Sequence, residues 1–215
     1  MDITWLGHAC FRLRSRDVAV VTDPFSGEGW GHQAIATAGN IVTVSHQDPH
    51  HSYAEGVTGN PRVVSGPGEY EIGGVMITGI PGLRRTGQGE PPGKNTMYLL
   101  LIEDIRVCHL GDIAGPLTSE QLIVAQDAEI LLVPVGGNCT INGAESAKVV
   151  AQIEPRVIIP MHYATPETAG HLDLEGLDRF RREMGVSELP AQNRFSVTAN
   201  SLPLEPTVVI LEQRR

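Results

Sequence analysis

Residues 41–51 of the chain read IVTVSHQDPHH, an apolar run that leads directly into a polar segment. The β-branched residues 41–44 predict a buried strand, and three of the eight histidines of the chain fall within the six residues 46–51 of the turn that follows it. Neutral imidazoles and carboxylates are ligands that zinc, iron, manganese and nickel accept. The segment therefore predicts a metal site built from His46, Asp48, His50 and His51.

The same segment has a second interpretation as the start of a helix. Asp48 followed by Pro49 is typical of a helix N-terminus, with aspartate as the N-cap and proline at the first helical position. The sequence looks helical through 52–55, and neighbouring helical residues point about 100° apart, so only one of His50 and His51 would need to face a site. From this segment alone, ligation and helix capping are equally supported.

Two other predicted strands end in residues of the same chemistry. HLGD at 109–112 follows a strand, and Gly111 lets the backbone turn so that the Asp112 carboxylate projects from the edge of the sheet. PMHY at 160–163 follows another buried strand and places His162 at its end. Three separate strand ends thus offer His or Asp, which favours metal binding over capping.

The remaining pattern predicts an α/β (α+β) protein. Short β-rich runs come first, and alternating helices and strands follow from residue 118, which suits two sheets packed face to face with helices outside. The predicted strands are 2–6, 10–14, 18–22, 41–44, 63–64, 70–72, 75–80, 96–103, 105–109, 130–133, 157–160 and 207–211. The predicted helices are 119–126, 144–153 and 172–184, and residues 81–94 are expected to form a loop of functional interest. No Pro, Gly or Ser-rich linker divides the chain, so we expect one domain over residues 1–215.

Composition excludes several classes of partner. The chain has 215 residues, a formal net charge of -9 and 19% charged residues, and it lacks the basic face that binding to a nucleic-acid backbone requires. No apolar run approaches the about 20 residues of a membrane span, and the N-terminus has no signal-peptide pattern. We therefore expect a cytoplasmic protein that acts on a small molecule, binds neither nucleic acid nor membrane, and allows a homo-oligomer.

The cysteines carry little signal. Cys10, Cys108 and Cys139 are an odd number without CxxC spacing. In a reducing compartment such residues are typical small buried hydrophobes, so we expect neither disulfides nor zinc ligands among them.

The chain as a whole resembles the metallo-β-lactamase superfamily, and within it the compact branch of L-ascorbate-6-phosphate lactonase-like hydrolases. The segments that carry the resemblance are WLGHA at 5–9, TDP at 22–24, the His46 loop, GPGEY at 66–70, NT at 95–96, HLGD at 109–112 and PMHY at 160–163. The resemblance implies a four-layer αββα sandwich with a metal in the cleft at the sheet edges.

The chain departs from that family at two places. The family's signature loop reads His-x-His-x-Asp-His. Here Asp48 stands at the position of the second histidine and His50 at that of the aspartate, so the two residue types are exchanged. A further metal histidine usually follows the strand at 75–80, but this chain has Leu83, Arg84 and Arg85 there. Arginine stays protonated and offers no lone pair, so this ligand is missing.

The resemblance implies a role for each candidate residue. The ligands of one or two divalent ions, zinc or else manganese, nickel or iron, would come from His46, Asp48, His50, His51, Asp112 and His162. Asp112 would also hold the attacking water or take its proton, and His8 would relay protons or bind substrate. Asp23 would orient a ligand histidine or serve as an ordinary turn residue, and His109 would pack behind the ligands. His32 and His171 are expected at the surface.

Two functions remain open from the sequence. The first is a metal-dependent hydrolase of a small ester, lactone or phosphoester, in which Arg84 and Arg85 clamp an anionic group of the substrate. The alternative for the two arginines is simple solvation of a loop. The second function is a non-catalytic binding protein in which the altered loop and Arg84 have abolished metal chemistry while the fold persists.

Overall fold

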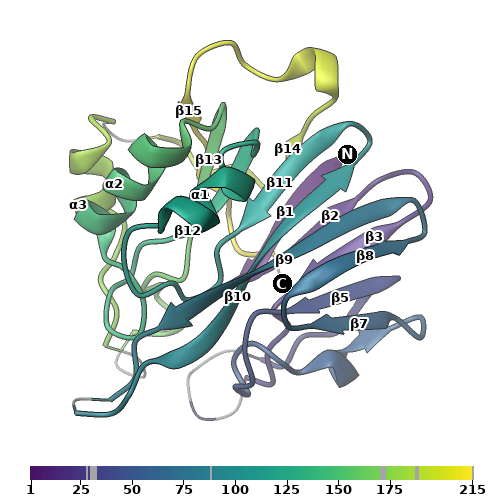
Figure 1. Ribbon diagram of the computed structural model, residues 1–215, viewed down its shortest axis with the longest axis horizontal. Coiled ribbons are helices and arrows are strands. Elements are labelled where there is room, and N and C mark those ends of the chain that lie inside the picture. Colours follow the sequence, from purple (N-terminus) through teal and green to yellow (C-terminus); the bar gives the residue numbers. More distant parts are fainter. Residues whose placement is uncertain (28, 30–32, 88, 170–172, 187–188, 215) are drawn as a thin grey trace.

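The computed structural model describes residues 1–27, 29, 33–87, 89–169, 173–186 and 189–214, and its framework is a pair of β-sheets (Figure 1). The first sheet has six strands in the order β14-β1-β2-β3-β5-β7. Strand β2 is antiparallel to β1 and β3, whereas β3, β5 and β7 are parallel to one another. The strands are β1 (Asp2–Gly7), β2 (Cys10–Arg14), β3 (Ala19–Thr22), β5 (Ile41–Val44), β7 (Arg62–Ser65) and β14 (Phe195–Ser196).

The second sheet has seven strands in the order β15-β13-β12-β11-β10-β9-β8. Strands β8 to β11 form an antiparallel meander, and β11, β12, β13 and β15 are parallel. The strands are β8 (Gly68–Ile72), β9 (Val75–Arg84), β10 (Gly93–Ile102), β11 (Ile105–His109), β12 (Ile130–Pro134), β13 (Val157–Met161) and β15 (Thr207–Val208). The carboxyl ends of β11, β12 and β13 therefore lie side by side.

Helices pack beside the parallel part of the second sheet (Figure 1). Helix α1 (Ser119–Ala125) begins at a capping box on Thr118, and α2 (Gly143–Ile153) begins at one on Asn142. Helix α3 (Asp178–Glu183) packs against α2. These caps satisfy backbone donors that the first turn leaves free, which explains where both helices start.

The outer face of the first sheet is covered differently. Its side chains, including Leu6, Val21 and Val42, pack with Phe25 and Val57 into a second, smaller core. The covering segments are the 3₁₀ turn η1 (Ala54–Gly56) and the two-stranded sheet of β4 (Thr37–Ala38) and β6 (Val57–Thr58). The two mixed sheets confirm the α/β class that the sequence predicted.

The main core lies between the two sheets. Alternate residues of the first sheet, such as Phe11 and Ile41, face Ile77 and Leu100 of the second, and all four are nearly or fully buried. The Tyr98 hydroxyl on β10 donates to the Val44 carbonyl at 2.9 Å and accepts from the Gly66 amide at 3.0 Å. A buried hydroxyl with satisfied partners thus joins the sheets next to the end of β5.

Some predicted elements differ in extent. Strands β9 and β10 take up both ends of the expected loop at 81–94, pairing Arg84 with Gly93, because their backbone bonds continue where the sequence shows no periodicity. The expected helix at 172–184 starts only at Asp178, since Glu175 is held outside it by backbone bonds to Gly136 and Ala164; residue 172 lies outside the described part of the chain. The helical turn expected at 52–55 is η1, and the strand expected at 207–211 pairs at 207–208, with one further isolated bridge at Leu211.

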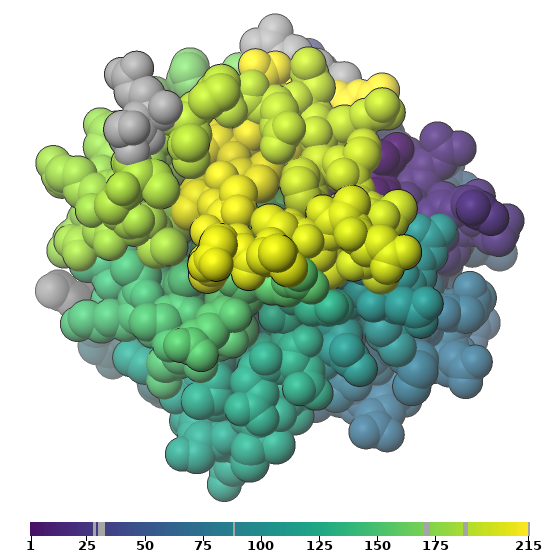
Figure 2. All heavy atoms as spheres, turned by 90° about the horizontal axis from the view of Figure 1, so that it is seen from above, coloured from purple at the N-terminus to yellow at the C-terminus, as the bar shows by residue number. Residues whose placement is uncertain are grey.

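The C-terminal segment joins both sheets. It contains the 3₁₀ turn η2 (Ala199–Ser201), and it supplies β14 to the first sheet and β15 to the second. Seen from above, these yellow residues lie across one face of the molecule (Figure 2). Among the described residues, no helix is both long and apolar enough to cross a membrane.

Candidate metal centre

Six strand ends meet at one edge of the two sheets. His8 follows β1, Asp23 follows β3, and the His46–His51 segment follows β5 of the first sheet. Asp112, Cys139 and His162 follow β11, β12 and β13 of the second sheet. Strands β1, β3 and β5 run in the same direction, and β11 to β13 are parallel to one another. The topology of each sheet, rather than the local sequence, therefore brings its side chains together.

Asp112 lies at the centre of this edge and is 1% exposed. Its Oδ2 atom is 3.9 Å from His46 Nε2 and 3.4 Å from His51 Nε2. The donor atoms of these three residues lie within 4.8 Å of one another, close enough to hold one ion. Both histidines are buried.

A second group of donors shares the same carboxylate. The Oδ1 atom of Asp112 is 3.3 Å from His162 Nε2, and the Cys139 thiol is 3.7 Å from Oδ2 and 3.8 Å from His162 Nε2. We expected Cys139 to be a buried hydrophobe and no ligand, yet it is half-buried and faces two candidate ligands. Its position after a buried parallel strand was the signal that could have found it.

His8 forms a third group with His51 and His162. Its Nε2 is 3.1 Å from His51 Nε2, and its ring centre is 3.8 Å from that of His162. Burial, followed by the charges of His162 and His51, lowers the pKa of His8 well below its ordinary value. His8 is therefore neutral at pH 7 and has a nitrogen close to the centre.

Electrostatics favour a neutral His46, an ionised Asp112 and a protonated His162. Burial and the neighbouring His51 lower the pKa of His46 to about 4, so its imidazole is neutral at pH 7. Burial opposes the charge on Asp112 and on His162, but their mutual attraction outweighs it. The pKa of Asp112 is held well below its ordinary value and that of His162 well above it.

Asp23 fixes the orientation of His51. It is fully buried, and its Oδ2 accepts a hydrogen bond from His51 Nδ1 at 2.8 Å while its Oδ1 accepts one from the Ser45 amide at 2.8 Å. Ser45 Oγ also donates to Asp23 and lies 3.0 Å from His46 Nδ1. The hydrogen bond from Nδ1 to Asp23 therefore holds the His51 ring with its Nε2 atom directed at Asp112. Such a carboxylate partner is common behind metal-ligating histidines.

Asn95 and His109 hold the loop that carries Asp112. Asn95 Oδ1 accepts from the Asp112 amide at 3.0 Å, and Asn95 Nδ2 donates to the Leu110 carbonyl at 2.9 Å. His109 Nε2 donates to the Ala9 carbonyl at 2.8 Å and Nδ1 accepts from the Gly111 amide at 3.2 Å. Neither side chain joins the donor groups, so both act behind Asp112; the role of Asn95 was missed from the sequence.

Three residues of the centre have left-handed backbones. The φ angles of His8, Asp23 and His162 are +52°, +39° and +53°. Such conformations cost a non-glycine residue about 1 to 3 kcal/mol, and they persist where surrounding structure enforces them. The His162 amide donates to the His8 carbonyl at 3.0 Å, and Trp5 Nε1 donates to the same oxygen at 2.9 Å.

Asp48 and His50 lie at the rim, outside the buried donor groups. Asp48 accepts from the His50 amide at 2.9 Å through its side chain and from the His51 amide at 2.8 Å through its carbonyl, as a residue capping a short turn does. The side chains of His50 and Asp48 are 28% and 32% exposed. The structure thus brings together His46, His51, Asp112 and His162 and keeps these two apart. His32 and His171 lie outside the described residues.

The two arginines of the β9–β10 turn differ in their surroundings. Arg85 donates to Glu145 at 2.6 Å and to the Thr140 carbonyl at 2.8 Å, so its charge is already paired. Arg84 has no such ion pair among the described residues, and its charge contributes to the lowered pKa of His46. Arg84 therefore offers an available cation beside the donor groups.

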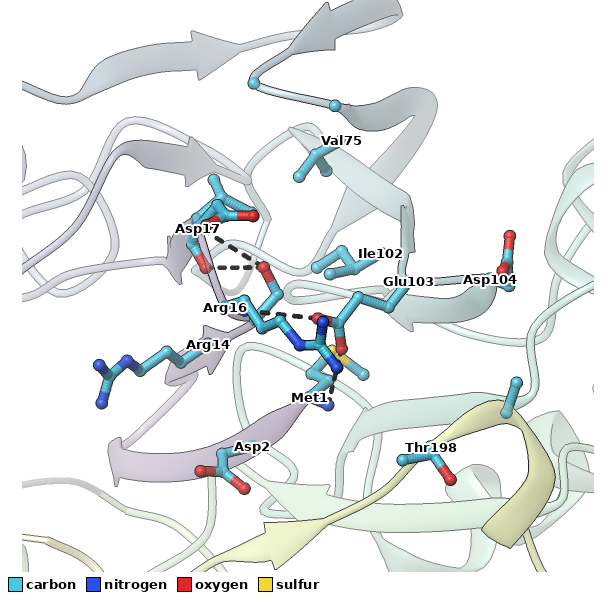
Figure 3. A pocket seen from close by; sticks show the side chains of 15 residues that line it. Met1, Asp2, Arg14, Arg16, Asp17, Val75, Ile102, Glu103, Asp104 and Thr198 are labelled. Carbon is cyan, nitrogen blue, oxygen red and sulfur yellow. Dashed lines mark hydrogen bonds and ion pairs between the residues drawn. The ribbon is translucent and has the colours of Figure 1, made fainter.

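The chain also has a large open cavity at the other end of the sandwich. It measures about 750 Å³ and is lined by Met1, Arg14, Arg16 and Glu103, among others (Figure 3). The N-terminal ammonium donates to Glu103 at 2.8 Å. Strand β1 starts in this cavity and ends at the histidines, so the cavity and the donor groups lie at opposite ends of the strand.

The donor set fits a divalent transition ion. Among the described residues, Asp112 Oδ1 and His162 Nδ1 are buried atoms without a hydrogen-bond partner. Buried polar atoms are rarely left unsatisfied without a reason, and a place for a metal ion is one such reason. Imidazole, carboxylate and thiolate donors suit zinc and related ions, and these residues would hold one or two of them.

The two packed sheets and the histidine–aspartate centre at their shared edge define a class, the metallo-β-lactamase fold. Residues 2–162 match the beta-lactamase superfamily domain. The chain belongs to the metallo-β-lactamase superfamily.

Relatives and solved structures agree with this membership. A UPF0173 metal-dependent hydrolase of Methanoregula boonei is 30% identical over 193 residues, covering 78% of this chain and 84% of the relative. A structure from Thermotoga maritima, assigned as a Zn-dependent hydrolase of the superfamily, has a TM-score of 0.78 and 34% identity, covering 98% of this chain and 97% of the other. The metallo hydrolase Igni18 of Ignicoccus hospitalis shares the fold, with a TM-score of 0.65, 16% identity and coverage of 92% and 99%.

Proposed function

We propose that the chain is a metal-dependent hydrolase of small anionic esters, lactones or phosphoesters. The observation that carries the proposal is the buried Asp112 carboxylate, which lies within 4 Å of nitrogens of His46, His51 and His162. The relatives named as metal-dependent hydrolases support the reaction class. A lactonase-like substrate is consistent with the family branch that the sequence resembles.

His46, His51, Asp112 and His162 are the residues that we assign to the metal. When bound, a zinc ion or a similar ion supplies a Lewis acid and lowers the pKa of coordinated water toward neutrality. Asp112, ionised and central, orients the attacking water. Asp23 keeps the His51 imidazole in one tautomer and in one orientation.

His8 is the residue that we assign to proton transfer. It is neutral at pH 7 because burial lowers its pKa, so a ring nitrogen keeps a lone pair for a proton from water, and the same shift makes it quick to release that proton again. Its contact with His51 at 3.1 Å keeps that ring beside the donor groups. A proton acceptor held next to the reacting atoms is what general base catalysis requires.

Arg84 sets the proposed preference for an anionic substrate. Arg84 is half-buried, its charge acts on His46, and no ion pair neutralises it among the described residues. Guanidinium groups bind phosphate and carboxylate in a bidentate manner. Arg85 is assigned to the structure of the neighbouring loop rather than to the substrate, because Glu145 already pairs with it.

The test combines metal analysis with a substrate panel. Protein purified without chelator should carry near-stoichiometric transition metal and hydrolyse at least one chromogenic ester, lactone or phosphoester, and a His51→Ala and His162→Ala double variant should lose both properties. An Asp17→Asn variant, altered at the far end of the sandwich, should keep them. Protein that folds but never binds metal would instead support a non-catalytic binding protein.

A further inference from the structure

We infer that Cys139 is a sulfur ligand of the ion that Asp112 and His162 hold. The inference rests on the proposed function, because it concerns the same centre. It adds a thiolate ligand, a type that the sequence analysis excluded. It also gives the loop between β12 and α2 a role in binding the metal.

The distances among the three side chains fit the edges of a metal coordination sphere. Cys139 Sγ is 3.8 Å from His162 Nε2 and 3.7 Å from Asp112 Oδ2, and His162 Nε2 is 3.3 Å from Asp112 Oδ1. Zinc bonds of about 2.3 Å to sulfur and about 2.0 to 2.2 Å to nitrogen and oxygen give tetrahedral edges of about 3.4 to 3.6 Å. One donor atom from each of the three residues lies within 4.8 Å of the others, which is near the size that one bound ion needs.

The carboxylate has an atom available for such an ion. Asp112 Oδ1 is buried and has no hydrogen-bond partner among the described residues, although Oδ2 faces the Cys139 thiol. His46 and His51 approach the carboxylate at Oδ2, whereas His162 approaches it at Oδ1. Asp112 is thus shared between two donor groups, and Cys139 supplies the third side chain of the second group.

The backbone around Cys139 is fixed by contacts on both sides. The Arg85 amide donates to the Cys139 carbonyl at 3.2 Å, and the Arg85 side chain donates to the next carbonyl, that of Thr140, at 2.8 Å. The Thr140 hydroxyl donates to the Ile113 carbonyl at 3.0 Å, which joins the Cys139 loop to the Asp112 loop. The thiol is therefore positioned before any ion arrives.

Binding at this position has a defined chemical balance. The thiol bonds to the ion as the thiolate, and its proton passes to solvent, so no oxidant or reductant is needed. A thiolate beside imidazole and carboxylate favours zinc or cobalt over magnesium or calcium, which prefer oxygen ligands.

The test measures metal–sulfur bonding directly, on the full chain. Metal-stripped protein is loaded with Co²⁺, and the near-ultraviolet sulfur-to-cobalt charge-transfer band is recorded for the wild type, Cys139→Ser and Cys108→Ala. We expect the band in the wild type and in Cys108→Ala and its loss in Cys139→Ser. The affinity of the second ion should fall more than about tenfold in Cys139→Ser, since even an outer-shell partner of a metal ligand contributes that much.

A second measurement does not depend on the variants folding. Wild-type protein is treated with iodoacetamide with and without Zn²⁺, and the modified cysteines are identified by mass spectrometry. Cys139 should be modified in the metal-free protein and protected by metal, whereas the fully buried Cys10 and Cys108 should stay unmodified in both states.

The outcomes separate this inference from the proposed function. Protein that binds metal at His46, His51 and Asp112 but shows neither the charge-transfer band nor protection of Cys139 overturns the inference and leaves the hydrolase proposal intact. Protein that binds no metal at all overturns both.

Discussion

The Nδ1 atom of His51 lies 2.8 Å from the Oδ2 atom of Asp23, and both side chains are almost entirely buried. The contact joins the end of β3 to the loop after β5. Burial opposes the negative charge on Asp23, yet the charge of His109 and the hydrogen bond from His51 together lower its pKa. Asp23 is therefore ionised, and His51 presents its other nitrogen to Asp112.

Replacing Asp23 with asparagine should weaken metal binding while leaving the fold intact. Asparagine keeps only one acceptor oxygen, and when the Ser45 amide uses it the NH₂ group faces His51 Nδ1, so the imidazole loses its fixed tautomer. Outer-shell partners of this kind contribute about 10- to 100-fold to metal affinity, and we expect a loss in that range. Competition with a fluorescent zinc chelator measures it. Asp17→Asn is the control, and equal affinities of the two variants would contradict the prediction.

Replacing His8 with asparagine should slow turnover without removing metal. Loss of a positioned general base lowers kcat by about 10²- to 10⁴-fold. Metal content, measured by elemental analysis, should remain at the wild-type value. A parallel fall of metal content would show that His8 serves as a ligand instead.

Arg84→Gln should discriminate against anionic substrates. Removing a hydrogen bond to a charged group costs about 1.5 to 3 kcal/mol, which corresponds to a KM about 10- to 100-fold higher for a phosphoester or carboxylate-bearing ester. The KM of a neutral ester should hardly change. Arg85→Gln, whose charge is paired with Glu145, should leave the ratio between the two substrates unaltered. The same ratio in both variants would argue against an anion clamp.

Metal-free protein should lose stability as the pH falls from about 6.5 toward 4. The folded-state pKa of His46 is about 4, below its ordinary value of 6.5, so in this window the unfolded chain binds more protons. The free energy of unfolding then falls by up to about 1.4 kcal/mol per pH unit for this one group. The raised pKa of His162 has the opposite sign and acts on the alkaline side. Urea titrations of chelator-treated protein measure the slope, which should be shallower in His46→Gln; an unchanged slope would refute the assignment.

Gly111→Ala should damage both the fold and the metal centre. The backbone of Gly111 has a φ of +57°, and an added Cβ would lie 2.4 Å from Asn95 Oδ1 and 2.7 Å from Ser45 Cβ. The left-handed backbone alone costs alanine about 1 to 2 kcal/mol, and the two contacts add to this. For a chain of this size we expect the melting temperature to fall by more than about 4 °C. Gly115→Ala, where a Cβ would meet nothing within 4 Å, is the matched control and should melt like the wild type.

The sequence predicted the sheets, and it pointed to the histidines and the aspartate that lie together at their edge, because both follow from the same pattern. Apolar β-branched runs ending in His or Asp indicated β5, β11 and β13, and those strand ends do meet in the structure. Their convergence could be expected since chemistry collects at the carboxyl ends of parallel strands. The exchanged residues Asp48 and His50 could not be resolved, because a capping carboxylate and a ligand carboxylate look alike in a sequence.

Cys139 was missed for a different reason. Counting cysteines and their spacings ignores position, and Cys139 has no partner cysteine nearby in the sequence. Only the parallel pairing of β12 between β11 and β13 brings its loop beside Asp112. The extension of β9 through Arg84 was likewise decided by pairing with β10 rather than by any periodicity of its own residues.

The donors come from both halves of the sandwich, His46 and His51 from one sheet and Asp112, Cys139 and His162 from the other. An ion held among them would work as a cross-link between the sheets, since neither sheet alone offers a complete set of ligands. Its binding free energy would then add to the resistance of the whole molecule to unfolding and proteolysis. The metal status of the chain in a cell would consequently govern how long it survives there as well as what it catalyses.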